Sequence, residues 1–147
     1  MNFTSADSLA FVDTNVLVYA YDGASGDKHA TARALVEELL DSRRGCVSVQ
    51  VLQELYVTLR RLLPDTLDST AAGTIVEAFA TWTTHVPDAR AVLAAIDLHE
   101  RARISFWDAM IVRSASALGC DVLYTEDLSA GQRYDDVLVV NPFVEPS

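Results

Sequence analysis

Four acidic side chains could act together in this sequence, although they lie in distant parts of the chain. Asp13 interrupts the apolar run FVDTNVLVY, and Glu54 lies within an apolar helical stripe. Asp108 lies near the start of another helical segment, and Asp127 follows a short apolar run. Carboxylates that converge repel one another and hold their protons to higher pH unless a cation neutralises them. The chemistry to expect from these four residues is the binding of a hard divalent ion.

Ligands that are all oxygen favour Mg²⁺ or Mn²⁺, which take few carboxylates and keep sites for water and phosphate oxygens. A pair of such ions roughly 3.5–4 Å apart can activate water and stabilise the leaving oxygen of a phosphodiester. The four acids therefore predict a metal-dependent phosphodiesterase.

Each acid also has a simpler explanation when it is considered alone. Asp13 suits the N-cap of a helix, and Ser105 with Asp108 forms the capping-box pattern S-x-x-D. Glu54 could be a solvent-facing helix residue, and Asp127 could belong to a polar turn. A capping role and a ligand role are compatible, so the arrangement of the four acids must decide between them.

The elements that would position these acids alternate between strands and helices. Short apolar runs predict strands at 9–12, 46–49, 84–86, 122–124 and 137–140. Helical spacing of apolar residues predicts helices at 16–21, 28–40, 51–62, 70–82, 88–100 and 106–118. No hairpin signal such as Asn-Gly is present. This alternation predicts an α/β fold with a parallel sheet and right-handed crossovers.

The predicted sheet would bring the acids to one edge. In open parallel sheets, ligands bind at the carboxyl ends of the strands. Asp13 directly follows the first strand, Glu54 lies early in the helix after the second, and Asp127 follows the 122–124 strand. A right-handed crossover helix begins at that same edge, so Asp108 can join them. The simpler explanations weaken because all four acids fall at one edge.

Composition bounds the class of protein. The chain has 147 residues, half of them hydrophobic, which predicts one globular domain over 1–147. No apolar run reaches the length of a membrane span, and the N-terminus lacks the features of a secretory signal. Cys46 and Cys120 match no metal-binding spacing, so we expect reduced core thiols and a cytoplasmic protein.

The net charge of −10 argues against nucleic acid as a partner, because phosphate binding usually leaves a basic footprint. Divalent ions held by the acids would remove this objection by supplying a local positive field. An acidic protein also suits a basic protein partner.

Four blocks of sequence, in order, resemble one known family over essentially the whole chain. They are FVDTNVLVY, SVQVLQEL at 48–55, SFWDAMIVRSASALGCDVLYTEDL at 105–128, and the closing LVVNPF. The chain resembles a PIN domain, specifically a VapC-type toxin of a type II toxin–antitoxin pair. The resemblance implies a three-layer fold with a central, mainly parallel sheet of four to five strands flanked by helices.

The resemblance also implies an activity and a site. Members of this family are endoribonucleases that use Mg²⁺ or Mn²⁺, often as homodimers, and a VapB-like antitoxin silences them. By resemblance, the metal and catalytic residues are those already singled out: Asp13, Glu54, Asp108 and Asp127. Asn15 and Thr125 match supporting polar positions, and Glu126 is a reserve ligand beside Asp127.

Other residues near these motifs have less specific interpretations. Trp107 could stack on a base, but we expect it in the core on the apolar face of its helix. Arg113 is expected to be a surface residue. The histidines have no partners at metal-binding spacing, and we expect surface or loop positions for His29, His85 and His99.

Competing functions differ in their sequence requirements. A receiver-type domain needs a second acid after the first strand and a lysine late in the chain, and this sequence has neither. A D-x-D phosphatase needs an acid at position 15, where this sequence has Asn15. Nucleotide-binding enzymes would carry G-x-G-x-x-G or a P-loop, and neither is present. The remaining alternative is a PIN-like module without catalysis that acts by protein or RNA contact.

Overall fold

The computed structural model describes residues 8–144 and contains alternating strands and helices. The strands are β1 (Ala10–Val12), β2 (Gly45–Ser48), β3 (Thr83–His85), β4 (Val122–Tyr124), β5 (Arg133–Tyr134) and β6 (Val137–Val140). The helices are α1 (Thr14–Tyr19), the short 3-10 helix η1 (Gly23–Ser25), α2 (Asp27–Ser42), α3 (Val49–Leu62), α4 (Ser69–Phe79), α5 (Ala89–Ala102) and α6 (Phe106–Ala117). Each predicted helix is present, with ends that shift by up to three residues.

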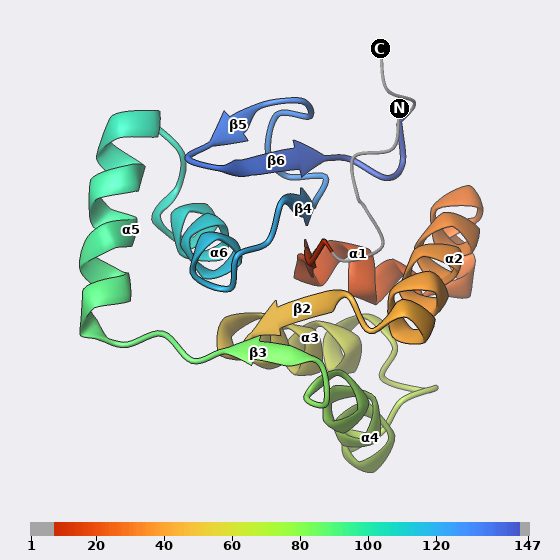
Figure 1. Ribbon diagram of the computed structural model, residues 1–147. Coiled ribbons are helices and arrows are strands. Elements are labelled where there is room, and N and C mark those ends of the chain that lie inside the picture. The colour runs from red at the N-terminus through yellow and green to blue at the C-terminus, as the bar shows by residue number, and fades with distance from the viewer. Residues whose placement is uncertain (1–7, 145–147) are drawn as a thin grey trace.

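One sheet holds all the described strands, in the order β3-β2-β1-β4-β6-β5 (Figure 1). The first five of these pair in parallel, and β5 pairs with β6 in the antiparallel sense. The predicted mainly parallel sheet is confirmed. The number of strands, predicted as four to five, is six.

The additional strand comes from a hairpin that the sequence analysis did not predict. Tyr134 pairs with Val137, so only Asp135 and Asp136 separate β5 from β6. Asp135 has a φ of 54°, in the left-handed region that tight hairpin turns use. Aspartate tolerates this region better than most residues. The expectation of no hairpin was wrong because the turn here is Asp-Asp rather than Asn-Gly.

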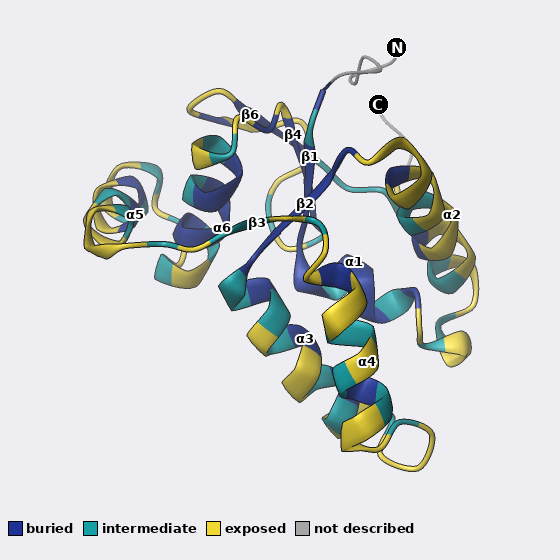
Figure 2. Ribbon diagram, turned by 60° about the horizontal axis from the view of Figure 1, so that its bottom comes forward, coloured by how far each residue is buried: buried dark blue, intermediate teal, exposed yellow. Residues whose placement is uncertain are grey.

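Helices cover both faces of the sheet, which confirms the three-layer prediction. α6 packs against β2, β3, β4 and β6, and α5 packs on α6. α2 and α3 contact β2, α1 lies between α2 and α3, and α4 packs on α3. Figure 2 shows α5 and α6 on one side of the strands and α2 on the other.

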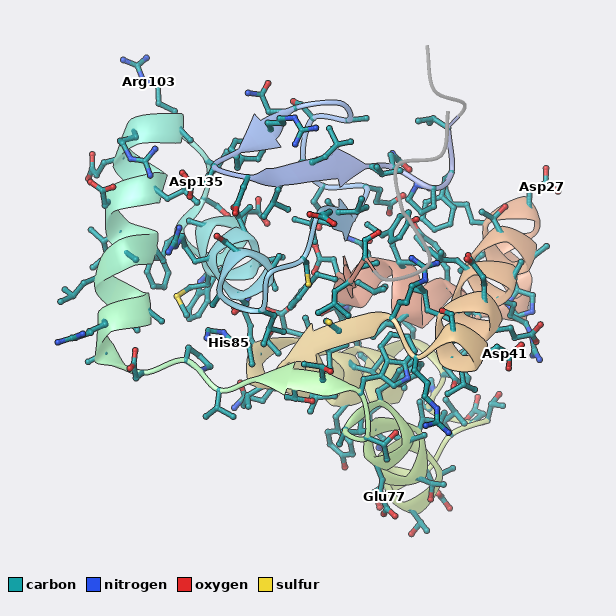
Figure 3. The ribbon with its side chains drawn as sticks, in the orientation of Figure 1. Asp27, Asp41, Glu77, His85, Arg103 and Asp135 are labelled. Carbon is teal, nitrogen blue, oxygen red and sulfur yellow. The ribbon has the colours of Figure 1, made fainter. Side chains whose placement is uncertain are left out.

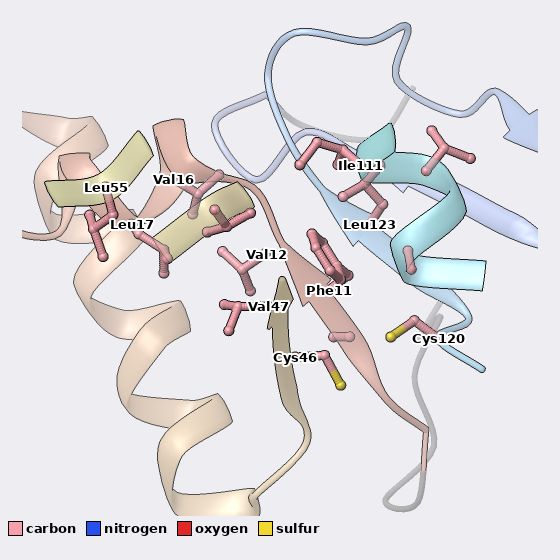
Figure 4. Close-up of a cluster of buried hydrophobic side chains, with 14 of the residues drawn as sticks. Phe11, Val12, Val16, Leu17, Cys46, Val47, Leu55, Ile111, Cys120 and Leu123 are labelled. Carbon is pink, nitrogen blue, oxygen red and sulfur yellow. The ribbon is translucent and has the colours of Figure 1, made fainter. Parts of the chain in front are cut away.

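The core lies on both faces of the central strand β1, whose three residues are all buried. Phe11 faces Ile111 of α6 and Leu123 of β4, whereas Val12 faces Val16 and Leu17 of α1 (Figure 4). This alternation follows from the two-residue period of a strand. It also explains why β1 is a continuous apolar run in the sequence.

Two predictions about single residue types can be compared with this core. Cys46 and Cys120 are both buried and free, as expected for core thiols. The histidines are less peripheral than expected, because each ring bonds to a neighbouring group. The pairs are His29 Nδ1 with the Tyr19 carbonyl (2.9 Å), His85 Nδ1 with the Ser114 hydroxyl (2.8 Å) and His99 with the Ile104 carbonyl. The expectation of surface or loop histidines was therefore only partly right, since these residues are half-buried and lie in helices and a strand rather than in loops.

Side-chain caps start the helices at the ends of strands. Ser48 is both the last residue of β2 and the N-cap of α3, and its hydroxyl accepts from the Val51 N–H at 3.3 Å. Asp88 caps α5 in the same way, as predicted. Within residues 8–144, no helix is both long enough and apolar enough to cross a bilayer.

Candidate metal centre

Asp13 lies where β1 ends and α1 begins, and it does cap that helix. One carboxylate oxygen accepts from the Thr14 N–H at 2.8 Å and the other from the Thr125 hydroxyl at 2.8 Å. Burial raises the pKa of Asp13 to about 7, and the nearby charges of Asp127 and Glu54 raise it further against the effect of these hydrogen bonds. Capping requires only the bond from the Thr14 N–H, so the burial of Asp13 and its bond to Thr125 go beyond what a helix cap needs.

Thr125 connects Asp13 to two other predicted site residues, Asn15 and Asp127. Its hydroxyl donates to Asp13 and accepts from the Asp127 N–H at 3.1 Å and from the Asn15 amide at 3.4 Å. Asn15 Nδ2 also donates to the Asp127 carboxylate at 2.8 Å. The structure thus brings together Asp13, Asn15, Thr125 and Asp127 in one hydrogen-bond network. Asn15 Oδ1 is buried and has no partner within residues 8–144.

Glu54 lies in the second turn of α3 and is held by two uncharged donors. The Thr14 hydroxyl donates to one carboxylate oxygen at 3.0 Å, and Gln50 Nε2 donates to the other at 2.9 Å. Thr14 belongs to α1 and Gln50 lies one turn earlier on α3. The Glu54 carboxylate is therefore fixed between two helices that begin at the carboxyl edge of the sheet.

Asp108 lies in the first turn of α6. The Ser105 hydroxyl caps this helix by accepting from the Asp108 N–H at 3.0 Å, as the capping-box pattern predicts. Partial burial raises the pKa of the Asp108 carboxyl, the Ser105 hydroxyl opposes that rise, and the charges of Asp127 and Glu54 add to it. Asp108 is thus close enough to Glu54 and Asp127 to feel their charge, as its predicted place at this edge requires.

No cation of the described chain compensates these four carboxylates. Within residues 8–144, none of the Lys, Arg or His side chains forms an ion pair with any of them. Other carboxylates, such as Asp27, Asp41 and Glu77, point outward from the molecule (Figure 3). In the same part of the chain, no three Asp, Glu, His or Cys side chains are already arranged as the ligands of one ion. The acids form a shared negative field rather than a closed cage.

Glu126 lies outside this group. Its two oxygens accept from Tyr19 at 2.7 Å and from Lys28 at 2.8 Å. Burial raises the pKa of Glu126, but the bonds from Lys28 and Tyr19 outweigh it and hold that pKa below its ordinary value. The reserve ligand of the sequence analysis is therefore engaged elsewhere in this structure.

A hollow of roughly 280 Å³ opens beside the acids. Thr14, Asn15, Glu54 and Asp127 line one part of it, and Val18, Thr58 and Leu62 line another. Asp127 is exposed, whereas Asp13 is buried. A ligand that enters here meets polar groups at the sheet edge and apolar side chains along α1 and α3.

Two further residues of α6, Trp107 and Arg113, differ in how far they are exposed. Trp107 is 64% exposed, so the expected core position was wrong. The three residues that begin α6 cannot all face the core, and Phe106 is the one that packs against it. Arg113 is half-buried and forms an ion pair with Asp135 at 2.9 Å, so it is only partly the surface residue expected.

Two residues of the site did not emerge from the sequence. Thr14 is the middle residue of the Asp-Thr-Asn stretch, and Gln50 lies four residues before Glu54. The spacing of four places Gln50 and Glu54 on the same helix face, which is the signal that could have identified Gln50. Thr14 had no comparable signal, because its bond to Glu54 joins residues forty positions apart.

The sequence of this domain was compared with models of known families, and the PIN domain model matches residues 10–134. The chain belongs to the PIN domain family. The matched PIN segment contains all four acids and every strand up to β5. No curated protein matches the chain in sequence.

Solved structures with similar folds support the PIN architecture. VapC20 from Mycobacterium tuberculosis, described as a toxin that cleaves the sarcin–ricin loop, has a TM-score of 0.61 and 22% identity. The match covers 80% of this chain and 89% of VapC20. A toxin–antitoxin complex from Klebsiella pneumoniae gives a TM-score of 0.68 at 18% identity, covering 90% and 97% of the two chains. DNA-bound VapBC from Salmonella typhimurium gives 0.63 at 20% identity, covering 90% and 96%.

Proposed function

We propose that this PIN domain is a metal-dependent endoribonuclease that hydrolyses RNA phosphodiester bonds and serves as the toxin of a toxin–antitoxin pair. The observation that supports this proposal most directly is the uncompensated charge at the sheet edge. The charges of Glu54 and Asp127 help to raise the pKa of both Asp13 and Asp108 there, and no side-chain cation of the described residues pairs with any of the four acids. Folding alone gives no reason to gather like charges at one edge without a cation, because they repel one another.

The donors at this edge fit Mg²⁺ or Mn²⁺. Both ions prefer oxygen ligands, and Mg²⁺ usually takes one or two carboxylates with several waters and substrate phosphate oxygens rather than a closed protein cage. Asp13, Glu54, Asp108 and Asp127 are the residues that would hold the ion. The buried Asn15 Oδ1 adds an acceptor that lacks a donor in the described chain. When bound, such an ion supplies an activated water and neutralises charge that develops on the phosphate.

Hydrogen bonds and helix caps of the chain hold the acidic side chains in place. Thr125 and the Thr14 N–H fix both oxygens of Asp13, and Asn15 fixes Asp127. The helix caps at Asp13 and Ser105 place the starts of α1 and α6 at the same edge. Asp127 is exposed at the rim of the hollow, so a large substrate such as RNA could approach the acids from that side.

The toxin role is supported by the kinds of protein that share this fold. The similar structures are described as toxins or toxin–antitoxin complexes from three different bacteria. We therefore propose a VapB-like antitoxin as partner and a homodimer as the assembly of this chain. The net charge of −10 suits a basic segment of an antitoxin near the acidic edge.

The test is a cleavage assay on mixed cellular RNA with Mg²⁺, Mn²⁺ or EDTA, using wild type and Asp13→Asn. We expect fragments with either ion, none in EDTA, and at least a hundredfold loss of rate in Asp13→Asn. Absence of metal-dependent cleavage on all RNA, or equal cleavage by the variant, would favour the non-catalytic binding module instead.

A further inference from the structure

The way in which Glu54 is held implies a role for Gln50, a residue that the sequence analysis did not single out. Glu54 accepts from Gln50 Nε2 at 2.9 Å and from the Thr14 hydroxyl at 3.0 Å. Both donors are uncharged, so they orient the carboxylate without neutralising it. Glu126 differs from Glu54 in this respect, because its partner Lys28 is a cation that neutralises its charge. Glu54 is therefore oriented by hydrogen bonds and has no ion-pair partner within residues 8–144.

The amide of Gln50 reaches a second element as well. The same Nε2 lies 3.4 Å from the main-chain carbonyl of Trp107, the residue just before Asp108. Both neighbours of this nitrogen are acceptors, so the amide must present its NH₂ group there, and the reverse orientation would place two acceptors together. Gln50 thus joins Glu54 of α3 to the first turn of α6.

This orientation leaves the other end of the amide unsatisfied. Gln50 Oε1 is buried and has no hydrogen-bond partner within the described residues. A buried acceptor without a donor destabilises a fold, and an apolar side chain of the same shape would avoid that loss. Stability alone therefore does not account for glutamine at this position.

We infer that Gln50 is a positioning residue that fixes the Glu54 carboxylate and holds it in register with Asp108. This inference rests on the proposed metal-dependent function. Without the Gln50 donor, like charge from Asp108 and Asp127 would turn the Glu54 carboxylate away from the group. The distance between the carboxylates of α3 and α6 would then vary, and a divalent ion would bind more weakly.

The test compares Gln50→Leu and the smaller Gln50→Ala with Gln53→Leu as the matched control. Gln53 lies on the same helix, three residues further on, and its side chain is exposed. The first readout is Mn²⁺ affinity by calorimetry without RNA, and the second is thermal melting in EDTA. We expect the Gln50 variants to bind Mn²⁺ about tenfold or more weakly. Gln50→Leu should melt in EDTA no earlier than wild type, and Gln53→Leu should match wild type in both readouts.

A double-mutant cycle separates positioning from a purely structural role. In a Glu54→Gln background, Gln50→Leu should change Mn²⁺ affinity by less than twofold, because the carboxylate that it orients is gone. If wild type binds Mn²⁺ and Gln50→Leu binds it equally well, this inference is overturned but the proposed function is not. The inference would also be overturned if Gln50→Leu weakened Mn²⁺ binding equally in the wild-type and Glu54→Gln backgrounds. A wild type that neither binds Mn²⁺ nor cleaves RNA would overturn both.

Discussion

Asp13 is a carboxylate in a place that penalises its charge. Burial raises its pKa from 3.8 to about 7 although two hydrogen bonds favour the charged form. The folded chain therefore binds a proton more tightly than the unfolded chain does. Between pH 3.8 and about 7, each rise in pH lowers the free energy of unfolding, and above about 7 the loss is complete. At about 1.4 kcal/mol per pKa unit, that loss is roughly 4 kcal/mol.

This pH dependence gives a test of the setting of Asp13. In EDTA, Asp13→Asn should be more stable than wild type at pH 8 and should lose most of the decline in melting temperature between pH 4 and 8. Added Mg²⁺ should stabilise wild type at pH 8 far more than the variant. The measurement is a set of thermal melts across pH, with Asp41→Asn as the control, because Asp41 is exposed on α2. Parallel pH profiles for wild type and Asp13→Asn would contradict the account.

At the scale of single residues, the sequence singled out the four acids but not every residue that contacts them. Asp13 suited both a cap and a ligand role, and the structure shows the cap together with the nearby charges of Glu54 and Asp127. The core position predicted for Trp107 was wrong because helical periodicity identifies the apolar face of a helix but does not show which of its residues other elements cover. The bond from Thr14 to Glu54 depends on the packing of α1 against α3, which no local pattern encodes.

At the scale of elements, the amino-terminal end of β2 lies very close to a tryptophan. A Cβ atom added to Gly45 would lie 2.5 Å from the Trp82 ring. That ring packs edge-on against Phe79 at 5.0 Å between centroids, which limits its movement on that side. Glycine at this position lets Trp82 cover the start of β2, the strand that leads into α3 and Glu54.

Substitution of this glycine should therefore be costly. Gly45→Ala should lower the free energy of unfolding by about 1–3 kcal/mol, as expected for overpacking. Gly73→Ala is a suitable comparison, because Gly73 lies within α4 with nothing near its missing Cβ, and alanine there should add about 0.5–1 kcal/mol. Denaturant titration of both variants measures these changes. Equal stability of Gly45→Ala and wild type would contradict this prediction and show that the Trp82 ring can move aside.

Prediction of the elements was strongest where a strand is buried on both faces or a helix begins at a side-chain cap. β1 and α5 illustrate the two cases, through the apolar run at 9–12 and the cap at Asp88. The hairpin of β5 and β6 was missed because β5 has only two residues, too few to show a period, although β6 was predicted. Its turn takes a left-handed aspartate, which sequence alone does not mark.

At the scale of the whole molecule, the parallel sheet makes the site possible. Asp13, Glu54, Asp108 and Asp127 span more than a hundred residues of sequence, and parallel pairing of β1, β2 and β4 brings their ends to one edge. This convergence could be predicted from the alternation of strands and helices. What could not be predicted is the separation of the carboxylates, since it depends on how α3 and α6 pack.

The central claim is that these four carboxylates form one site for a divalent ion. It is tested most directly by titrating Mn²⁺ into the metal-free protein and measuring free Mn²⁺ by electron paramagnetic resonance. The account predicts saturable binding to wild type and to Asp41→Asn, and binding at least tenfold weaker in Asp108→Asn. Absence of saturable binding to wild type, or equal binding by Asp108→Asn, would contradict it.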